Sequence, residues 1–330
     1  MIMKKQLLSI ALMLFGVLSA FAEEAQIGGL WYNLSGTTAK VIQWKNSVKY
    51  TGDIVIPSTV TYNNADYTVT SIGDDAFNNC WDLTSVTIPN SVTTIGRWVF
   101  NNCKSMTSVS IGNSVGSMGD QVFCNCTSLT TLTIPNSVKS IGNYAFQDCS
   151  SLTSISISCN VMRIGESVFS GCSSLTHLSI PNGVTSIGIC AFRGCTGLTY
   201  IVLPSSLVYI NDQAFESCTG LTDVYCYAET IPYTSNEIFM STPINEVTLH
   251  VPAVSIEAYK EKKPWSDFKN FVALTDSDPK PANMSEVKIS EGNATVAKFY
   301  TIDGKRISNP LKGINILRMS DGTSKKVVVK

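Results

Sequence analysis

The feature that most constrains the fold is a motif that recurs seven times, with a period of 23 residues, across residues 71–226. Each copy places a phenylalanine five positions after an aliphatic residue, and a cysteine three positions after the phenylalanine. No insertion or deletion breaks the register, so we expect the copies to stack as equivalent coils of a solenoid. The two columns are Phe77, Phe100, Phe123, Phe146, Phe169, Phe192 and Phe215, and Cys80, Cys103, Cys126, Cys149, Cys172, Cys195 and Cys218.

Each copy also predicts its own local structure. Apolar and polar residues alternate over residues 83–88, which predicts a short strand, and Pro89 ends it. Residues 92–96 form a second extended run. We expect residues 97–103 to make a helical turn that places Phe100 in the core. A coil of this kind buries its apolar side chains only when it lies between two others.

The cysteines raise the question of disulfides, because the chain has 11 of them. Seven occupy one column, and neighbouring strands lie ~4.8 Å apart, whereas a disulfide prefers Cβ atoms ~3.8 Å apart with a defined twist. We therefore expect a reduced, buried ladder of small apolar side chains. Cys124 and Cys126 lack the spacing of a zinc pair, and no histidine is near them in the sequence. No metal or other cofactor is predicted.

Residues 1–22 are typical of a secretory signal peptide. Lys4 and Lys5 precede an apolar run over residues 7–18, and Ala20 and Ala22 form a small-residue cleavage site. The alternative is a membrane anchor, but the apolar run is shorter than the ~20 residues that a spanning helix needs. No other stretch is apolar enough, so no transmembrane span is predicted in the mature chain.

The remaining segments flank the repeats. Residues 23–70 contain short alternating runs that predict an N-terminal β cap built on a hairpin or meander. The 23-residue phase is lost after Cys226, and residues 227–274 predict a mixed C-terminal cap with a helix over residues 255–263. Residues 275–285 form a polar linker with two prolines. Residues 286–330 form a small β tail.

The repeat unit Ile-Gly-x-x-x-Phe-x-x-Cys-x-x-Leu-x-x-Val-x-Ile-Pro-x-x-Val resembles the BspA-like (Treponema-type) leucine-rich repeat of bacterial cell-surface proteins. The resemblance covers residues 71–226. It implies a curved, right-handed solenoid that is secreted or exposed on the cell surface and is commonly associated with adhesion. Gly112, Asn211 and Cys226 depart from the pattern without threatening the fold.

The tail carries a second resemblance. Residues 298–330 are similar to the type A C-terminal sorting domain of type IX secretion cargo in Bacteroidota, with Asp303-Gly304 and Asp321-Gly322 as hairpin turns. Asn315 stands where that family usually has tyrosine. The resemblance implies export across the outer membrane, often with removal of the tail and surface attachment. The alternative is a small β domain that stays attached.

Catalysis and nucleic-acid binding are both disfavoured. The only histidines, His177 and His250, have no catalytic motif around them, and the context of His250 indicates a structural surface residue of the cap. The pair Asp74 and Asp75 lies in a loop and is expected to be solvated. Charged residues make up only 15% of the chain, the net charge is −1, and there is no basic stripe. We predict neither an enzyme nor a nucleic-acid partner.

The candidate ligand-binding residues are His177, Tyr200, Asp223 and Tyr225. They lie at the outward positions of the last repeat strands, where the first four repeats carry only serine and threonine. Tyrosines are enriched where proteins bind partners. Two alternatives stay open, namely that these side chains contact the C-terminal cap or that they are plain surface. Exposed Trp98 and Tyr144 can likewise grip a partner or lie flat on a neighbouring coil.

These patterns together predict an exported cell-surface protein, secreted or at the outer membrane, that recognises a host or microbial surface protein through the solenoid face. One alternative is a glycan-binding surface protein. The other is a cell-envelope scaffold without a discrete ligand.

Overall fold

The computed structural model describes residues 22–45 and 48–282, together with four tail strands within residues 296–329. The chain divides into two compact units, Met1–Met284 and Ser285–Lys330. The predicted signal peptide, apart from Ala22, and both Asp-Gly turns of the tail lie outside the described residues.

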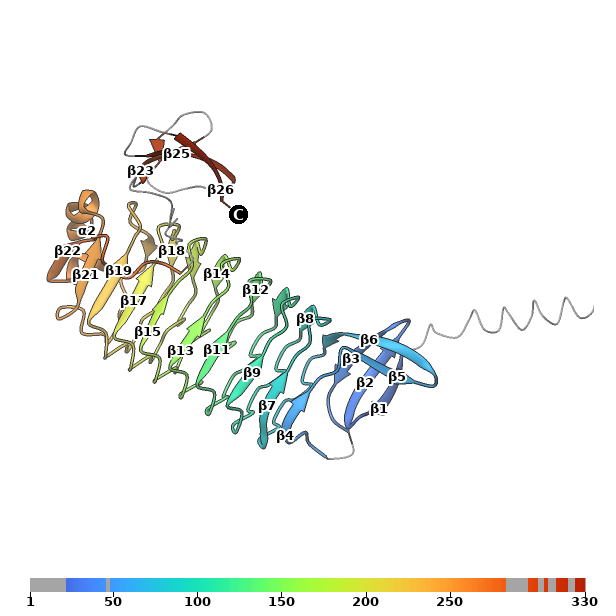
Figure 1. Ribbon diagram of the computed structural model, residues 1–330. Helices are drawn as coiled ribbons and strands as arrows, with labels where there is room; N and C mark the ends of the chain where they lie inside the picture. The colour runs from blue at the N-terminus through green and yellow to red at the C-terminus, as the bar shows by residue number, and fades with distance from the viewer. Residues whose placement is uncertain are drawn as a thin grey trace, which may run out of the picture. The chain divides into compact units, whose positions relative to one another are not determined.

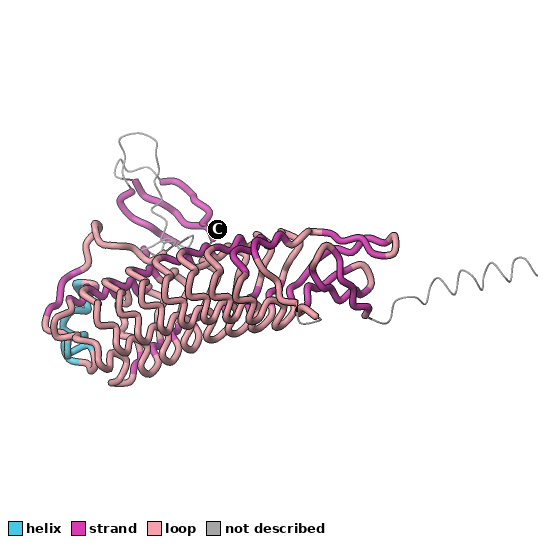
Figure 2. Tube along the Cα trace, turned by 90° about the horizontal axis from the view of Figure 1, so that it is seen from below, coloured by secondary structure: helices cyan, strands magenta, loops and turns pink. Residues whose placement is uncertain are grey.

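The first unit is a β-solenoid of about nine turns with a spacing of about 23 residues. Figures 1 and 2 show its coils stacked one after another. Each repeat coil contributes one strand to each of two parallel ladders. The strands of the first ladder are β4 (Gly52–Val55), β7 (Leu83–Thr87), β9 (Ser108–Ser110), β11 (Thr131–Thr133), β13 (Ser154–Ser156), β15 (His177–Ser179), β17 (Tyr200–Leu203), β19 (Asp223–Cys226), β21 (Thr248–Val251) and β22 (Asn270–Ala273). They form three hydrogen-bonded blocks, β4-β7-β9, β11-β13 and β15-β17-β19-β21-β22.

The second ladder consists of shorter strands. They are β6 (Ala65–Ile72), β8 (Thr94–Ile95), β10 (Ser117–Met118), β12 (Ser140–Ile141), β14 (Arg163–Ile164), β16 (Ser186–Ile187), β18 (Tyr209–Ile210) and β20 (Tyr233–Thr234). The first four continue a sheet from the N-terminal cap, and the last four pair with one another. Two short strands per coil place apolar side chains inward from both sides.

An antiparallel meander covers the first coil. It consists of β1 (Glu23–Ile27), β2 (Leu30–Ser35) and β3 (Thr38–Ile42), and β3 then pairs in parallel with β6. β5 (Thr59–Tyr62) forms a hairpin with β6. Tyr50 ends the aromatic column of the core, because its ring packs 5.0 Å from that of Phe77.

The core is a continuous stack of phenylalanine rings. All seven predicted phenylalanines are fully buried. Adjacent rings are nearly parallel, with centroids from 5.2 Å apart at Phe77–Phe100 to 5.6 Å at Phe123–Phe146. The stack continues past Cys226, because Phe239 lies 5.4 Å from Phe215. The phase therefore shifts by one residue after the last regular repeat instead of ending.

The prediction of a helical turn in each coil is wrong. Trp98 and Asn102 have φ of 54° and 58°, and the chain forms two successive tight turns closed by Asn101 N–H to the Trp98 carbonyl and Cys103 N–H to the Phe100 carbonyl. The N–H of Phe100 instead donates to the Val122 carbonyl of the next coil, at 2.8 Å. Stacked coils offer acceptors at every such position, and these replace the i−4 acceptors of a helix.

The C-terminal end is closed by short helices. They are η1 (Ala253–Ser255), α2 (Ile256–Glu261) and η2 (Trp265–Asp267). Tyr259 and Trp265 are fully buried, and Trp265 packs edge-on against Phe239 at 5.8 Å. These aromatics give the last coil the apolar neighbour that another repeat would otherwise provide.

The second unit is a four-stranded antiparallel sheet with the order β24-β23-β25-β26. Its strands are β23 (Val296–Thr301), β24 (Arg306–Ile307), β25 (Gly313–Met319) and β26 (Ser324–Val329). The sequence predicts a small β module here. Its identity as a sorting domain stays a prediction.

Candidate functional site

The first ladder brings the predicted site residues onto one face. In-register pairing places His177 beside Tyr200, and Tyr200 beside Asp223, in one outward column. Tyr225 lies in the other outward column, between Val202 on one side and His250 on the other. The parallel pairing of identical repeats causes this arrangement, because it aligns equivalent positions of successive coils.

Four rings in contact and one carboxylate form a connected surface, which we call the aromatic patch. Its residues are His177, Tyr200, Asp223, Tyr225 and His250. The His177 and Tyr200 rings stack with centroids 5.2 Å apart, and Tyr200 meets Tyr225 edge-on at 5.9 Å. Tyr225 stacks on His250 at 4.2 Å. Asp223 completes the patch, since its Oδ1 lies 2.8 Å from His250 Nε2.

His250 is the residue that sequence reasoning missed. Its sequence context indicates a structural surface residue of the cap, yet it follows Tyr225 in the outward column and holds Asp223. A signal is present in the sequence, because Leu249 and Val251 continue the inward positions of Val224 and Cys226. Aligning that strand as one more coil places His250 next to Tyr225.

The patch grades from exposed to buried toward the C-terminal end. His177 is exposed, Tyr200 and Tyr225 are half-buried, and the side chains of Asp223 and His250 are 31% and 12% exposed. Burial raises the pKa of Tyr225, and the Asp223 carboxylate raises it further. Tyr225 is therefore a neutral hydroxyl donor at physiological pH, beside a carboxylate that the imidazole already holds.

A segment of the chain lies next to the patch. Residues 275–282 follow β22, and the Tyr227 hydroxyl donates to the Pro279 carbonyl at 3.0 Å. The Asn182 N–H donates to the Ala282 carbonyl at 3.1 Å. The segment thus runs from the seventh repeat back to the fifth, near the strand ends that follow the patch, and it leaves His177 exposed.

Outside the patch, the two ladders differ in what they present. The outward positions of β7 to β13 carry serine and threonine, as predicted. On the second ladder Tyr209 and Tyr233 stack at 5.5 Å while remaining 53% and 63% exposed. Trp98 and Tyr144 are only half-buried, and Tyr144 donates its hydroxyl to Glu166. Tyr209 and Tyr233 therefore form a second, smaller aromatic surface on the opposite ladder.

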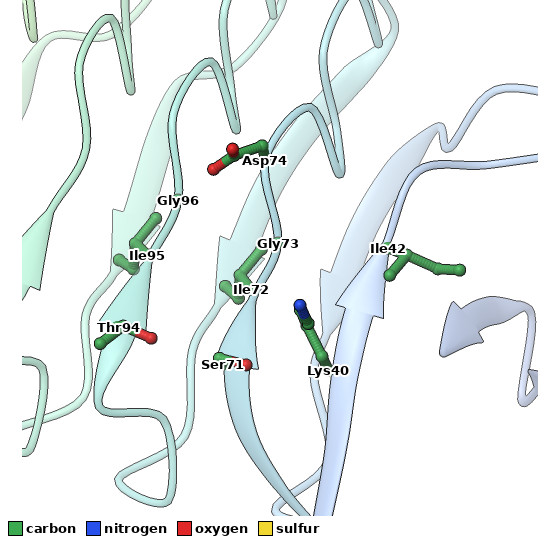
Figure 3. Close-up of a pocket in the computed structure, with 9 residues that line it drawn as sticks. All are labelled: Lys40, Ile42, Ser71, Ile72, Gly73, Asp74, Thr94, Ile95 and Gly96. Atoms are coloured by element: carbon green, nitrogen blue, oxygen red, sulfur yellow. The ribbon is translucent and has the colours of Figure 1, made fainter. Parts of the chain in front are cut away.

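A shallow depression of about 430 Å³ lies over β3, β6 and β8, lined by residues that include Lys40, Ser71 and Asp74 (Figure 3). Asp74 points toward the next coil, where its carboxylate accepts the Arg97 backbone N–H at 2.8 Å. This hydrogen bond is the main cause of the lowered pKa of Asp74. The carboxylate therefore caps the next coil, and its lowered pKa makes it a weaker base at neutral pH. Among the described residues, no three His, Cys, Asp or Glu side chains converge as a metal site.

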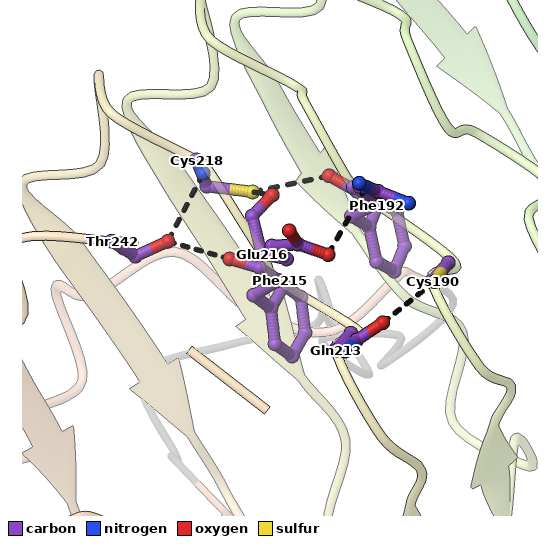
Figure 4. Close-up of polar contacts among 8 residues, drawn as sticks. Cys190, Phe192, Gln213, Phe215, Glu216, Cys218 and Thr242 are labelled. Atoms are coloured by element: carbon purple, nitrogen blue, oxygen red, sulfur yellow. Dashed lines mark hydrogen bonds and ion pairs between the residues drawn. The ribbon is translucent and has the colours of Figure 1, made fainter. Parts of the chain in front are cut away.

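The cysteine column is a set of hydrogen-bond donors. Each buried thiol from Cys103 to Cys218 lies 3.1–3.2 Å from the phenylalanine carbonyl of the preceding coil, as Cys218 does with Phe192 in Figure 4. All seven thiols of the column are free. Burial raises the pKa of Cys218 to about 12. A small apolar side chain with a weak donor thus adds a second hydrogen bond to a carbonyl that already accepts the backbone N–H closing its own turn.

The fold and its buried columns define the chain as a leucine-rich-repeat solenoid. The sequence profile of the BspA type leucine-rich repeat region matches residues 70–196 and 139–262, in six copies. The chain belongs to this family. Among the described residues, no helix is both long enough and apolar enough to cross a membrane.

Several solved structures are similar. A leucine-rich repeat protein of T. pallidum is 23% identical, with 64% of this chain and 86% of that protein covered and a TM-score of 0.46. A leucine-rich cell-surface protein of Faecalibacterium prausnitzii is 22% identical over 78% and 96%, with a TM-score of 0.46. A leucine-rich repeat protein of Bacteroides capillosus is 28% identical over 40% and 96%, with a TM-score of 0.35. No curated protein matches the chain.

Proposed function

We propose that this chain is an exported surface protein that recognises another protein, host or microbial, through the aromatic patch. The connected chain of rings from His177 to His250 is the observation that carries the proposal. Tyrosine and histidine rings offer large contact areas with polar tips and lose little conformational freedom on binding, because each has only two side-chain torsions. The serine and threonine face of the earlier coils lacks such groups.

Family membership supports the surface location. The family is one of bacterial surface proteins, and the F. prausnitzii protein is described as a cell-surface protein. In this proposal residues 1–22 direct export and residues 286–330 act as a type IX sorting tail. Mass spectrometry of the surface-bound form would identify its C-terminal peptide, and retention of the intact tail would contradict removal.

The test is binding of the full-length chain to an array of matrix proteins and glycans, compared with a Tyr200→Ala/Tyr225→Ala variant. We expect a protein ligand whose affinity falls about tenfold or more in the variant, as for residues central to an interface. Thr131→Ala/Ser154→Ala on the bland part of the same face is the matched control and should bind normally.

Three outcomes would change the proposal. A glycan ligand lost in the tyrosine variant would favour a glycan-binding protein, since stacked aromatic rings also suit sugars. Protein binding that survives the double substitution would move the site away from the patch. If a correctly folded sample binds neither class of ligand, a scaffold role in the cell envelope is favoured instead.

A further inference from the structure

The N-terminal end of the first ladder has an unpaired strand edge. β4 pairs with β7 alone among the described strands. Ile56 donates its N–H to the Thr87 carbonyl at 3.0 Å. Because peptide groups alternate along a strand, Asp53 and Val55 direct their N–H and C=O away from β7. Neither N–H has a backbone partner within residues 22–45 and 48–282.

A groove follows this free edge. It consists of two depressions of about 300 and 510 Å³, and Ile54 lines both. The β1–β2 turn borders the groove opposite β4, with Gln26 and Gly29 at the first depression and Ile27 and Gly28 at the second. The space beside the unpaired edge therefore has an opposite wall and extends along the strand.

The two ends of the groove differ in chemistry. The second depression is bordered by apolar side chains, which include Leu30, Pro57 and Val60. Val55, on the free edge, is 72% exposed, so its side chain is available to contact a partner.

The first depression is lined by Trp31 and by two lysines, Lys45 and Lys49. Lys49 Nζ lies 3.6 Å from the centroid of Trp81 and forms no ion pair with the described residues. Lys45 is paired with Glu24. The end of the groove near Thr51 therefore has one lysine, Lys49, without a carboxylate partner among the described residues.

We propose that this groove is a second binding site, separate from the aromatic patch, which takes an extended peptide of a partner protein as an added strand on β4. The peptide pairs with the N–H and C=O groups of Asp53 and Val55. Its apolar side chains contact the second depression. An acidic group at the end that reaches Thr51 pairs with Lys49.

Three separate features fit an added strand. They are the unpaired edge of β4, the wall opposite it, and the lysine without a carboxylate partner. A saccharide would leave the backbone groups of β4 without strand-like partners. A second copy of the chain would need to present an extended acidic segment at an accessible edge. Both remain outcomes of the test.

The test uses the full-length chain and fluorescein-labelled eight-residue peptides of alternating valine and threonine, with two glutamates at one end, in both chain directions. Fluorescence anisotropy gives the dissociation constant. The peptide that binds more tightly is then made as two isomers with N-methyl groups on alternate residues. One isomer has its methyl groups on one hydrogen-bonding edge of the extended peptide, and the other isomer has them on the opposite edge. Strand addition predicts that one isomer loses about tenfold or more in affinity, since each methyl removes a hydrogen bond, while the other stays within about threefold of the parent.

Protein variants give an independent readout. Val55→Pro removes the outward N–H from an edge position that tolerates proline and should weaken binding about tenfold. Val55→Thr keeps this N–H and should bind more tightly than Val55→Pro, and Val254→Thr, at an exposed valine of the C-terminal cap, is the control that should bind as the parent does. Lys49→Gln should weaken the glutamate peptide about threefold and leave a glutamine-substituted peptide unchanged. Melting curves of all variants establish that they are folded.

Four results would overturn the proposal. Equal loss with both methylated isomers, or with neither, would exclude strand pairing. Absence of any peptide binding up to about 1 mM would exclude the site. Binding of an acidic oligosaccharide in competition with the peptide would assign the groove to sugars. Self-association that Val55→Pro abolishes, without peptide binding, would assign it to a second copy. None of these results depends on whether the aromatic patch binds a ligand.

Discussion

Substitution of Phe146 by alanine should weaken the solenoid at its centre. The ring is fully buried between Phe123 and Phe169, with centroid distances of 5.6 and 5.5 Å and interplanar angles of 8°. Removal of a buried phenylalanine side chain costs about 3–5 kcal/mol. The coils above and below cannot collapse into the cavity without breaking their own backbone bonds, such as Phe146 N–H to the Val168 carbonyl. We therefore expect a loss near the upper end, about 4–5 kcal/mol.

Urea unfolding followed by circular dichroism measures this loss. Because each coil contacts only its neighbours, a break in the middle also lowers the coupling between the two halves, and the transition should broaden or split. Phe77→Ala is the matched comparison at the N-terminal end, where the ring has Tyr50 on one side. It should destabilise the first coils and leave the rest near the parent midpoint. A Phe146→Ala variant that unfolds within about 1 kcal/mol of the parent would refute the continuous-stack account.

Two further predictions concern coil spacing and pH. A Cβ at Gly142 would lie 2.4 Å from the Asp120 nitrogen, whereas at Gly116 the nearest atom is 3.8 Å away. Gly142→Ala should therefore cost about 1–3 kcal/mol of stability and lower the melting temperature, while Gly116→Ala should change it little. Equal melting temperatures of the two variants would contradict the close approach of the coils at Gly142. Burial raises the pKa of the Cys80 and Cys124 thiols from 9.0 to about 11. Between these two pH values the folded state keeps protons that the unfolded state releases. The free energy of unfolding should therefore be unchanged below pH 9 and fall above it by about 1.4 kcal/mol per pH unit for each such thiol. Urea midpoints at pH 8 and 10.5 measure this, and Cys80→Ala should reduce the difference; an unchanged midpoint would contradict protonated, buried thiols.

The solenoid and its core could be predicted because a strict period leaves one arrangement for the buried columns. Phe77 to Phe215 and Cys80 to Cys218 repeat without a gap, and each column can be buried only if the coils stack in register. The inward and outward alternation of the repeat strands then follows from strand geometry alone. Four of the five patch residues follow from the sequence in this way.

The rest depended on contacts that no single repeat encodes. His250 joins the patch because the chain coils once more with a longer spacing, in which His250 pairs with Tyr225 25 positions earlier, and the packing of Phe239 and Trp265 makes this coil favourable. The left-handed turn at Trp98 exists because the next coil supplies the hydrogen-bond acceptors. The free edge of β4 is defined by what the N-terminal meander leaves uncovered. Periodicity in the sequence determined the ladder of coils. The structure of its two ends was decided by tertiary packing, because an end coil has no equivalent coil on one side.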